Sequence, residues 1–165
     1  MPAKPPESPT RLDSLTETRT ALLELIAGAS RHLDILSPDL DRALFDNSDV
    51  ADAIRELVVR AGPQARIRIL VEDAAGVSHG GHQILGLGHR LTTAMDFRRL
   101  AAEDRGDVGN LVIADRNGLL RWDRNKASFA VDGRGDRGAA IAEGQQFDRR
   151  WDHSIDDPEL RRLAL

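Results

Sequence analysis

The sequence predicts an α/β protein whose mixed, largely parallel sheet is flanked by helices. Between residues 33 and 71, a short apolar run, a segment with one apolar stripe at helical spacing and a second apolar run follow one another. Such a strand–helix–strand order implies parallel pairing of the two strands. Later in the chain an Asn117-Gly118 pair separates two apolar runs, which is typical of a tight antiparallel hairpin. The sheet is therefore expected to be mixed.

The first helix and strand follow a proline-rich start. Residues 1–13 contain four prolines and no apolar core, so a disordered leader is expected there. Ser14 and Glu17 have the spacing of a capping box, and apolar residues recur at helical spacing behind them, which predicts a helix over 14–30. The apolar run over 33–36 predicts the first strand, and a Ser-Pro-Asp turn ends it.

The next helix is the clearest element of the sequence. Its apolar residues share one face, and they are Val50, Ile54, Leu57, Val58 and Ala61. Ser48 or Asp49 is expected to cap its start, and a Gly-Pro pair ends it. The alternating and then apolar run over 66–71 predicts a buried strand.

The rest of the chain completes one domain. The remaining elements are expected to be a glycine-containing helix over 78–91, strands over 95–100, 111–114, 119–122 and 129–131, and a last helix over 139–151. A single domain over 14–152 is therefore predicted, followed by a C-terminal tail over 153–165 that contains one short helix.

Composition excludes several classes of protein. The 165 residues suit one domain, and the absence of cysteine excludes disulfides and thiolate metal sites. No apolar run approaches the length of about eighteen residues that a membrane-spanning helix needs, so a cytoplasmic protein without a membrane partner is expected. The net charge of −4, with acids and bases interleaved, disfavours nucleic acid as a partner. No cofactor is expected.

The order of these elements resembles one half of the phospholipase D superfamily. The resemblance covers about residues 15–152 and includes an Arg-Ile-Leu-Val strand, a later hairpin and a final helix ending in Phe147-x3-Trp151. The superfamily signature is His-x-Lys-x4-Asp on a strand, followed by a Gly-Ser-x-Asn run. The chain is also similar to bacterial proteins that are grouped by this fold without an assigned activity.

Two positions of that signature carry different chemistry here. Aligning the signature aspartate with Asp115 places the histidine at Val108 and the lysine at Asn110, while Asn125 matches the asparagine. In the superfamily one histidine attacks phosphorus, a second protonates the leaving oxygen, and lysines stabilise the phosphate charge. Valine cannot act as a nucleophile, and asparagine brings no charge. Asp115 is expected to start an Asx-type turn.

The resemblance therefore implies a degenerate, non-catalytic half domain, a pseudoenzyme that serves as a binding or interaction module. Its protein partner is unknown. Because active relatives pair two halves and this chain has one, a homodimer is expected.

A second hypothesis is a hydrolase with a relocated, metal-dependent site. Ligands gather at the carboxyl ends of parallel strands, and the loops there bring polar side chains together. The candidate pocket residues are Asp39, Glu72, Asp73, His79, His82 and Trp122. On a helix over 78–91, His79 and His82 share an arc with His89, so the first two are candidate metal ligands. The alternative for the three histidines is a solvated polar face, and for Trp122 a residue that only covers the core.

Overall fold

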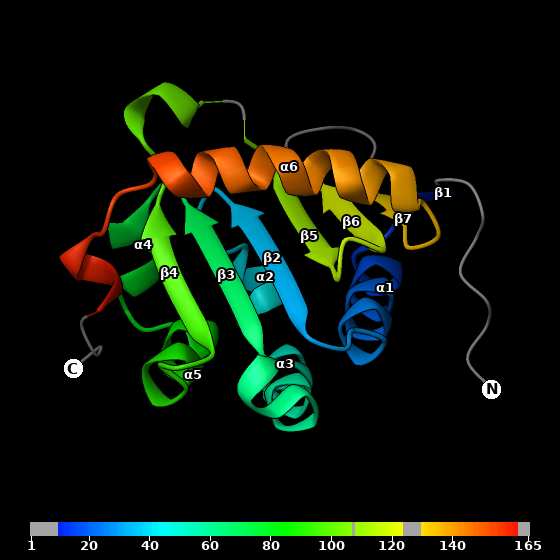
Figure 1. Cartoon of the computed structure of the whole chain (residues 1–165), viewed down its shortest axis with the longest axis horizontal. Helices are drawn as coiled ribbons and strands as arrows, with labels where there is room; N and C mark the ends of the chain where they lie inside the picture. Colours follow the sequence, from blue (N-terminus) through cyan, green and yellow to red (C-terminus); the bar gives the residue numbers. More distant parts are fainter. Residues whose placement is uncertain (1–9, 107, 124–129, 162–165) are drawn as a thin grey trace.

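A seven-stranded mixed sheet organises the chain, with the strand order β1-β7-β6-β5-β2-β3-β4. The computed structural model describes residues 10–106, 108–123 and 130–161. The strands are β1 (Thr10–Leu12), β2 (His32–Ser37), β3 (Arg66–Val71), β4 (Met95–Arg99), β5 (Asn110–Ala114), β6 (Gly118–Trp122) and β7 (Ala130–Gly133). The α-helices are α1 (Leu15–Ala27), α2 (Arg42–Phe45), α3 (Ser48–Ala61), α4 (Ala74–Ser78), α5 (Gln83–Arg90) and α6 (Arg137–His153) (Figure 1).

The pairing of the strands confirms a mixed α/β sheet flanked by helices. The β2–β3 and β3–β4 pairs are parallel, as the strand–helix–strand pattern predicts. The other four pairs are antiparallel, because β5 joins β2 in the opposite direction and β6, β7 and β1 follow by antiparallel pairing. The parallel part of the sheet is thus smaller than the sequence predicts, because every strand pair from β2–β5 to the β1 edge is antiparallel.

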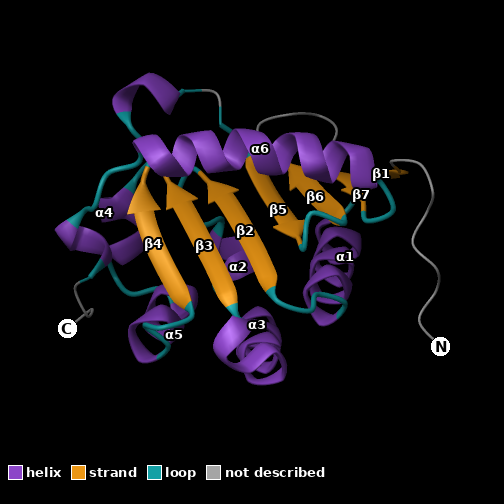
Figure 2. Cartoon of the chain, in the orientation of Figure 1, coloured by secondary structure: helices purple, strands orange, loops and turns teal. Residues whose placement is uncertain are grey.

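The sheet separates two apolar cores. Helix α6 lies across the strands (Figure 2), and its Phe147 packs in one core with Leu111 and Ile113 of β5. The alternate residues of the same strand, Val112 and Ala114, belong to the other core, which α1 and α3 cover. This alternation follows from the two-residue period of a strand. Helix α6 is therefore placed beside the first residues of β5.

The N-terminal boundary differs from the predicted leader. Thr10–Leu12 forms the edge strand β1, which pairs with β7, so the expectation of disorder is wrong for these residues. The serine half of the capping box is confirmed, because the Ser14 side chain accepts a hydrogen bond from the Glu17 backbone N–H at 3.1 Å. The Glu17 carboxylate accepts from the Asp13 N–H at 3.2 Å and not from the Ser14 N–H. Helix α1 ends at Ala27, three residues before the predicted end.

Helix α3 has the predicted apolar stripe but a different cap. The Asn47 side chain accepts a hydrogen bond from the Val50 backbone N–H at 2.9 Å, so Asn47 is the N-cap. The predicted caps, Ser48 and Asp49, lie inside the first turn. The N-cap is one residue before the first predicted position, because the asparagine side chain accepts the same backbone hydrogen bonds as serine or aspartate would.

The single helix predicted over 78–91 is wrong. Gly80 and Gly81 adopt φ angles of +75° and +81°, which a right-handed helix cannot continue through. The segment is therefore two short helices, with α4 ending at Ser78 and α5 beginning at Gln83.

The hairpin between β5 and β6 is confirmed with its turn between Ala114 and Gly118, but other residues of the turn than predicted adopt the positive φ angles. Asp115 and Arg116 adopt the positive φ angles, 54° and 53°, and not the predicted Asn117-Gly118 pair. Gly118 is required for a different reason: a Cβ atom there would lie 2.3 Å from the Arg134 carbonyl oxygen. Glycine here permits close approach of two backbones.

The described part of the C-terminal tail packs on the domain. Ile155 and Arg99 exchange two backbone hydrogen bonds of 2.8 and 2.9 Å, and a 3₁₀ turn follows over Pro158–Leu160. Leu160 is buried in the core beneath it. In the described ranges, none of the helices is long and apolar enough to cross a bilayer.

Candidate functional site

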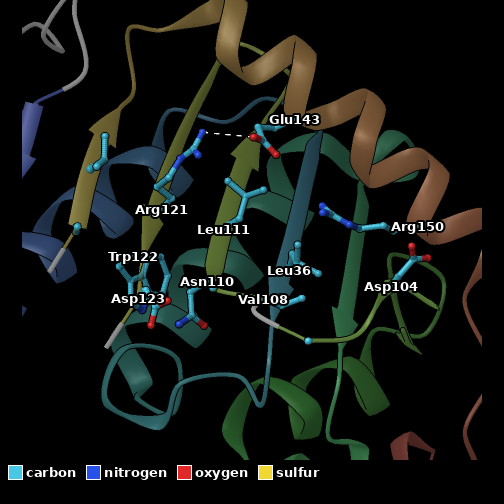
Figure 3. Close-up of a pocket in the computed structure, with 14 residues that line it drawn as sticks. Leu36, Asp104, Val108, Asn110, Leu111, Arg121, Trp122, Asp123, Glu143 and Arg150 are labelled. Atoms are coloured by element: carbon cyan, nitrogen blue, oxygen red, sulfur yellow. Dashed lines mark hydrogen bonds and ion pairs between the residues drawn. The ribbon is translucent and has the colours of Figure 1, made fainter. Parts of the chain in front are cut away.

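Two adjoining pockets open at the end of the sheet where β2 and β3 finish and β5 begins. The first, which we call the α6 pocket, has a volume of about 420 Å³ and lies between α6 and the β5–β6 pair (Figure 3). The second, which we call the loop pocket, has a volume of about 790 Å³ and lies between the loops that follow β2 and β3. Val108, Gly109, Asn110 and Asp123 line both, so the pockets form one cleft.

Asn110 is the polar centre of this cleft. Its side chain is buried, and the whole residue is only 6% exposed. Ser37 Oγ accepts a hydrogen bond from the Leu40 backbone N–H at 2.9 Å and donates its own hydrogen to Asn110 Oδ1 at 2.5 Å. This arrangement assigns the amide oxygen to Ser37 and leaves Nδ2 toward the cleft. In the part of the chain that the structure describes, Nδ2 has no hydrogen-bond partner.

Val108 is the residue that the sequence alignment predicts at the histidine position of the signature. Its side chain is partly buried and packs on the core beneath α6, beside Leu36 and Leu111. An aliphatic side chain at this point extends the apolar floor of the α6 pocket. The structure therefore places the residues aligned with the superfamily histidine and lysine together at the first turn into β5.

Trp122 lines the α6 pocket and covers the core at the same time. Its ring packs on Phe45 with centroids 5.4 Å apart, and its indole Nε1–H donates to Asp41 Oδ2 at 3.1 Å. Asp41 Oδ1 accepts in turn from the Ala43 backbone N–H at 3.1 Å. The buried Asp41 carboxylate is thus held by one donor from β6 and one from the start of α2.

Only some of the candidate pocket residues meet in the cleft. Asp39 and Glu72 line the loop pocket at the ends of β2 and β3, where the strand–loop pattern placed them. Glu72 also accepts a hydrogen bond from the Gly106 backbone N–H at 2.5 Å. Asp73 instead caps α4 by accepting from the Gly76 N–H at 2.9 Å. His79 follows α4, where its carbonyl accepts from Arg42 at 3.0 Å.

His82 is buried away from the cleft. Its Nδ1 accepts a hydrogen bond from the Ile84 backbone N–H at 3.1 Å, so its Nε2 carries the hydrogen and donates to the Leu40 carbonyl at 2.9 Å. Burial lowers the pKa of His82 below its ordinary value, which keeps the ring neutral. His89 contacts the Leu160 carbonyl at 2.9 Å. The three histidines therefore make hydrogen bonds to three different parts of the chain and do not share one helix face.

A metal-ligand cluster is not formed by the residues within the described ranges. Among them, no group of three or more His, Cys, Asp or Glu side chains has an arrangement that could hold a metal ion. His79 and His82, the candidate ligands, belong to the C-cap of α4 and the N-cap of α5. Neither histidine is among the described residues that line the loop pocket with Asp39 and Glu72.

Asp115 stands at the other end of β5 from Asn110, and its contacts are long-range. Its carboxylate accepts backbone N–H bonds from Ser30 at 2.7 Å, Arg31 at 3.0 Å and His32 at 2.9 Å. Burial opposes its ionisation, but these three bonds outweigh burial and hold the pKa of Asp115 below its ordinary value. Asp115 therefore fixes the loop before β2 and does not start a local Asx-type turn. Asn125 lies outside the described residues.

The described lining of the loop pocket carries excess negative charge. It includes four carboxylates and one arginine, a net charge of −3, and these residues are Asp39, Asp41, Glu72, Asp123 and Arg42. The arginine is engaged by the carbonyl oxygens of Gly76, His79 and Gly81 and by Asp46. A dianionic or polyanionic ligand would therefore meet repulsion in this pocket.

The α6 pocket has a mixed polar rim that the sequence patterns did not reveal. Arg121 of β6 and Glu143 of α6 approach within 3.5 Å across the pocket (Figure 3). Arg150 reaches in from the same helix, seven residues further on, opposite Asp104. The sequence could have indicated this pair only through its seven-residue spacing, which places Glu143 and Arg150 on one face of a helix.

The fold belongs to the phospholipase D-like class, which two solved structures of that fold show. NucT from Helicobacter pylori matches with a TM-score of 0.59 and 14% identity, over 91% of this chain and 98% of that chain. Phosphatidylserine synthase from Haemophilus influenzae Rd KW20 matches with a TM-score of 0.53 and 14% identity, over 89% and 38%. The chain itself belongs to the family DUF7931, a domain of unknown function, whose match covers residues 14–163.

A third structure with this fold is the archaeal chromatin protein TrmBL2, described as showing a novel mode of DNA binding. It matches with a TM-score of 0.65 and 13% identity, over 90% of this chain and 54% of that chain, so this chain spans about half its length. The fold thus occurs in a DNA-binding protein, and the expectation that nucleic acid is disfavoured is supported only by charge. Comparison with curated proteins finds no significant match.

Proposed function

We propose that this chain is a non-catalytic phospholipase D-like domain that acts as a binding module through the cleft at the start of β5. The observation that carries the proposal is the pair Val108 and Asn110, which occupies the positions aligned with the superfamily histidine and lysine. Phosphodiester hydrolysis of that type needs a nucleophile and a cation at these points. Here one side chain is aliphatic and the other is a neutral amide bonded to Ser37.

The other described side chains of the cleft supply no histidine in place of the lost nucleophile. Among the described residues that line the two pockets, none carries an imidazole, a thiol, a hydroxyl or an amine. The net negative charge of the loop pocket lining also opposes the charge of a phosphodiester. A phospholipase D-like fold without a histidine in this lining supports a role in binding over a role in catalysis.

A hydrolysis assay tests this proposal. The full chain is incubated with bis(p-nitrophenyl) phosphate, with and without Mg²⁺ or Mn²⁺, and release of p-nitrophenol is followed. We expect a rate equal to that of buffer. Turnover that disappears in Asn110→Leu and persists in Asn117→Ala, a matched change in the exposed hairpin turn, would overturn the proposal.

A relocated hydrolytic site is the second candidate, because Asp39 and Glu72 do meet in the loop pocket. Oxygen ligands of this kind suit a hard divalent cation. This candidate predicts a rise in the melting temperature on adding Mn²⁺ or Zn²⁺ that is lost in Asp39→Asn/Glu72→Gln. An unchanged melting temperature, together with metal-free protein by elemental analysis, removes it.

We also propose a homodimer, since the fold supplies one half of the paired arrangement of the superfamily and a symmetric pair is the usual closed assembly. Light scattering at tens of micromolar is expected to return twice the mass of 18.1 kDa. A monomer mass at that concentration contradicts this part of the proposal.

A further inference from the structure

We infer that the α6 pocket binds a small monocarboxylate with an apolar body, which accepts hydrogen bonds from the Arg150 guanidinium and packs its apolar part on the pocket floor. The inference rests on the proposed function, because it names the ligand class of one part of the same cleft. Three observations support it: an arginine without a partner in the pocket, the pairing of the other charged groups there, and the apolar floor.

Arg150 brings an unpaired cation to the pocket. Its side chain comes from α6, and its guanidinium end points into the pocket (Figure 3). Within the described ranges, this side chain makes no hydrogen bond, ion pair or ring contact. A guanidinium stays charged in proteins and binds a carboxylate through two parallel N–H bonds, which is a strong and directional contact. A ligand carboxylate would therefore supply the partner that the described protein groups do not.

The other charged side chains of the described lining are already engaged. Arg121 and Glu143 approach each other within 3.5 Å, and Asp123 also has a partner. Asp104 Oδ2 lies 3.7 Å from an imidazole nitrogen of α6. A ligand can thus neutralise Arg150 without breaking a contact within the protein. The three carboxylates in the same lining would repel a second negative charge, so the pocket fits a monoanion better than a phosphate dianion.

The floor of the pocket adds an apolar requirement. It consists of Leu36 of β2, Leu111 of β5 and Val108, which belong to the core beneath α6. The pocket volume of about 420 Å³ lies within the range of small-molecule sites, roughly 300–1,000 Å³. A ring or a short alkyl chain can lie on this floor, and removal of its apolar surface from water adds to the contact with Arg150. The ligand class is therefore an amphipathic carboxylate and not a bare anion.

Titration of the ¹⁵N-labelled full chain with 4-phenylbutyrate tests the inference. The indole N–H signal of Trp122, which lines the pocket, is expected to shift with a dissociation constant of about 1 mM for a ligand of this size. Four comparators each change one property. The alcohol 4-phenylbutanol lacks the charge, 4-phenylbutylamine reverses it, phenyl phosphate adds a second charge, and acetate lacks the apolar body. Each comparator is expected to bind at least about tenfold more weakly.

Two variants of α6 separate the arginine of the pocket from its neighbour. Arg150→Gln is expected to weaken 4-phenylbutyrate binding about tenfold and to leave 4-phenylbutanol binding unchanged. The matched control Arg149→Gln removes the adjacent, exposed arginine, whose side chain contacts Gln146, and is expected to change affinity less than about twofold. Val108→Ser makes the floor more polar and is expected to weaken both ligands alike, by about threefold. Thermal unfolding confirms that each variant is folded.

Equal weakening in Arg150→Gln and Arg149→Gln overturns the inference, because the ligand would then respond only to the net charge of the protein. Tighter binding of 4-phenylbutylamine or phenyl phosphate than of 4-phenylbutyrate overturns it too, as does an unshifted Trp122 indole at about 20 mM ligand. Phosphodiester hydrolysis alongside Arg150-dependent binding overturns the proposed function and supports this inference. Absence of both hydrolysis and 4-phenylbutyrate binding overturns this inference alone, so the two failures are distinguishable.

Discussion

Ser37 and Asn110 are joined by a buried hydrogen bond of 2.5 Å between neighbouring antiparallel strands, β2 and β5. The bond fixes the amide of Asn110, the residue that our sequence alignment predicts at the lysine position of the superfamily signature. Because Ser37 also accepts from the Leu40 N–H, it connects the first residue of β5 to the loop that follows β2. The geometry of the cleft therefore depends on this pair.

The first prediction concerns that pair. Ser37→Ala leaves Asn110 Oδ1 and the Leu40 N–H without partners, so we expect a loss of about 2 kcal/mol in the free energy of unfolding. In Ser37→Ala/Asn110→Leu the loss is expected to be smaller than the sum of the single losses, by about 1 kcal/mol. Urea denaturation measures both. Strict additivity would show that the two side chains are not coupled.

A second prediction concerns the pH dependence of stability at Asp115. Its pKa in the folded protein lies below the ordinary 3.8, so its contribution is present above that value and is lost as the pH falls further. Asp115→Asn is expected to cost about 1–2 kcal/mol at neutral pH, allowing for the partial exposure of the carboxylate. The difference from the wild type should shrink in acid. The exposed Asp152→Asn is the control, and a pH-independent difference contradicts this role.

A third prediction concerns the ion pair between Arg68 and Asp34 beneath α6. Arg68 binds Asp34 through two nitrogens, at 2.8 and 3.1 Å, and also contacts Asp148 of α6 at 2.8 Å. Burial raises the pKa of Asp34, and Arg68 offsets this only in part. Removing the cation in Arg68→Met is therefore expected to cost about 3 kcal/mol.

The control for Arg68 is Arg66→Met on the same strand. The Arg66 guanidinium bonds the nearby carbonyls of Pro63 and Ala65, so this change should cost less than about 1 kcal/mol. Replacing both partners in Asp34→Leu/Arg68→Met is expected to recover most of the loss, because no buried charge is left alone. Equal losses in the single and double variants, measured by thermal unfolding, would show that Asp34 does not depend on Arg68.

A fourth prediction compares two glycines. Gly118→Ala places Cβ 2.3 Å from the Arg134 carbonyl oxygen, so β6 must shift, and we expect a loss above about 2 kcal/mol. Gly86→Ala in α5 meets no atom within 4 Å and is expected to stabilise by about 0.5–1 kcal/mol. Their melting temperatures should move in opposite directions. A neutral Gly118→Ala would mean that the two backbones do not approach this closely.

The sequence predicts those elements whose cause is local. The apolar stripe of α3 and the run of β3 need no knowledge of the rest of the chain, and both are confirmed. The hairpin turn was placed correctly, but its positive φ angles were assigned to Asn117 and Gly118 because the close approach of Gly118 to the Arg134 backbone exists only in the folded protein. The break at Gly80 was missed because helical spacing continues on both sides of it.

The same distinction applies to the cleft. Asp39 and Glu72 could be placed from the rule that loops at the ends of parallel strands meet, and the structure brings them together. The Ser37–Asn110 bond could not be predicted, because it needs the antiparallel pairing of β2 with β5. His82 was misplaced because its role depends on the Leu40 carbonyl, distant in sequence.

We propose that no histidine of this phospholipase D-like domain attacks phosphorus. The most direct measurement is mass spectrometry of the full chain after incubation with a phosphodiester and quenching under alkaline conditions, which preserve a phosphorylated histidine. An unchanged mass is the result predicted by a cleft that holds Val108 and Asn110. A phosphoryl adduct mapped to any histidine would contradict the account.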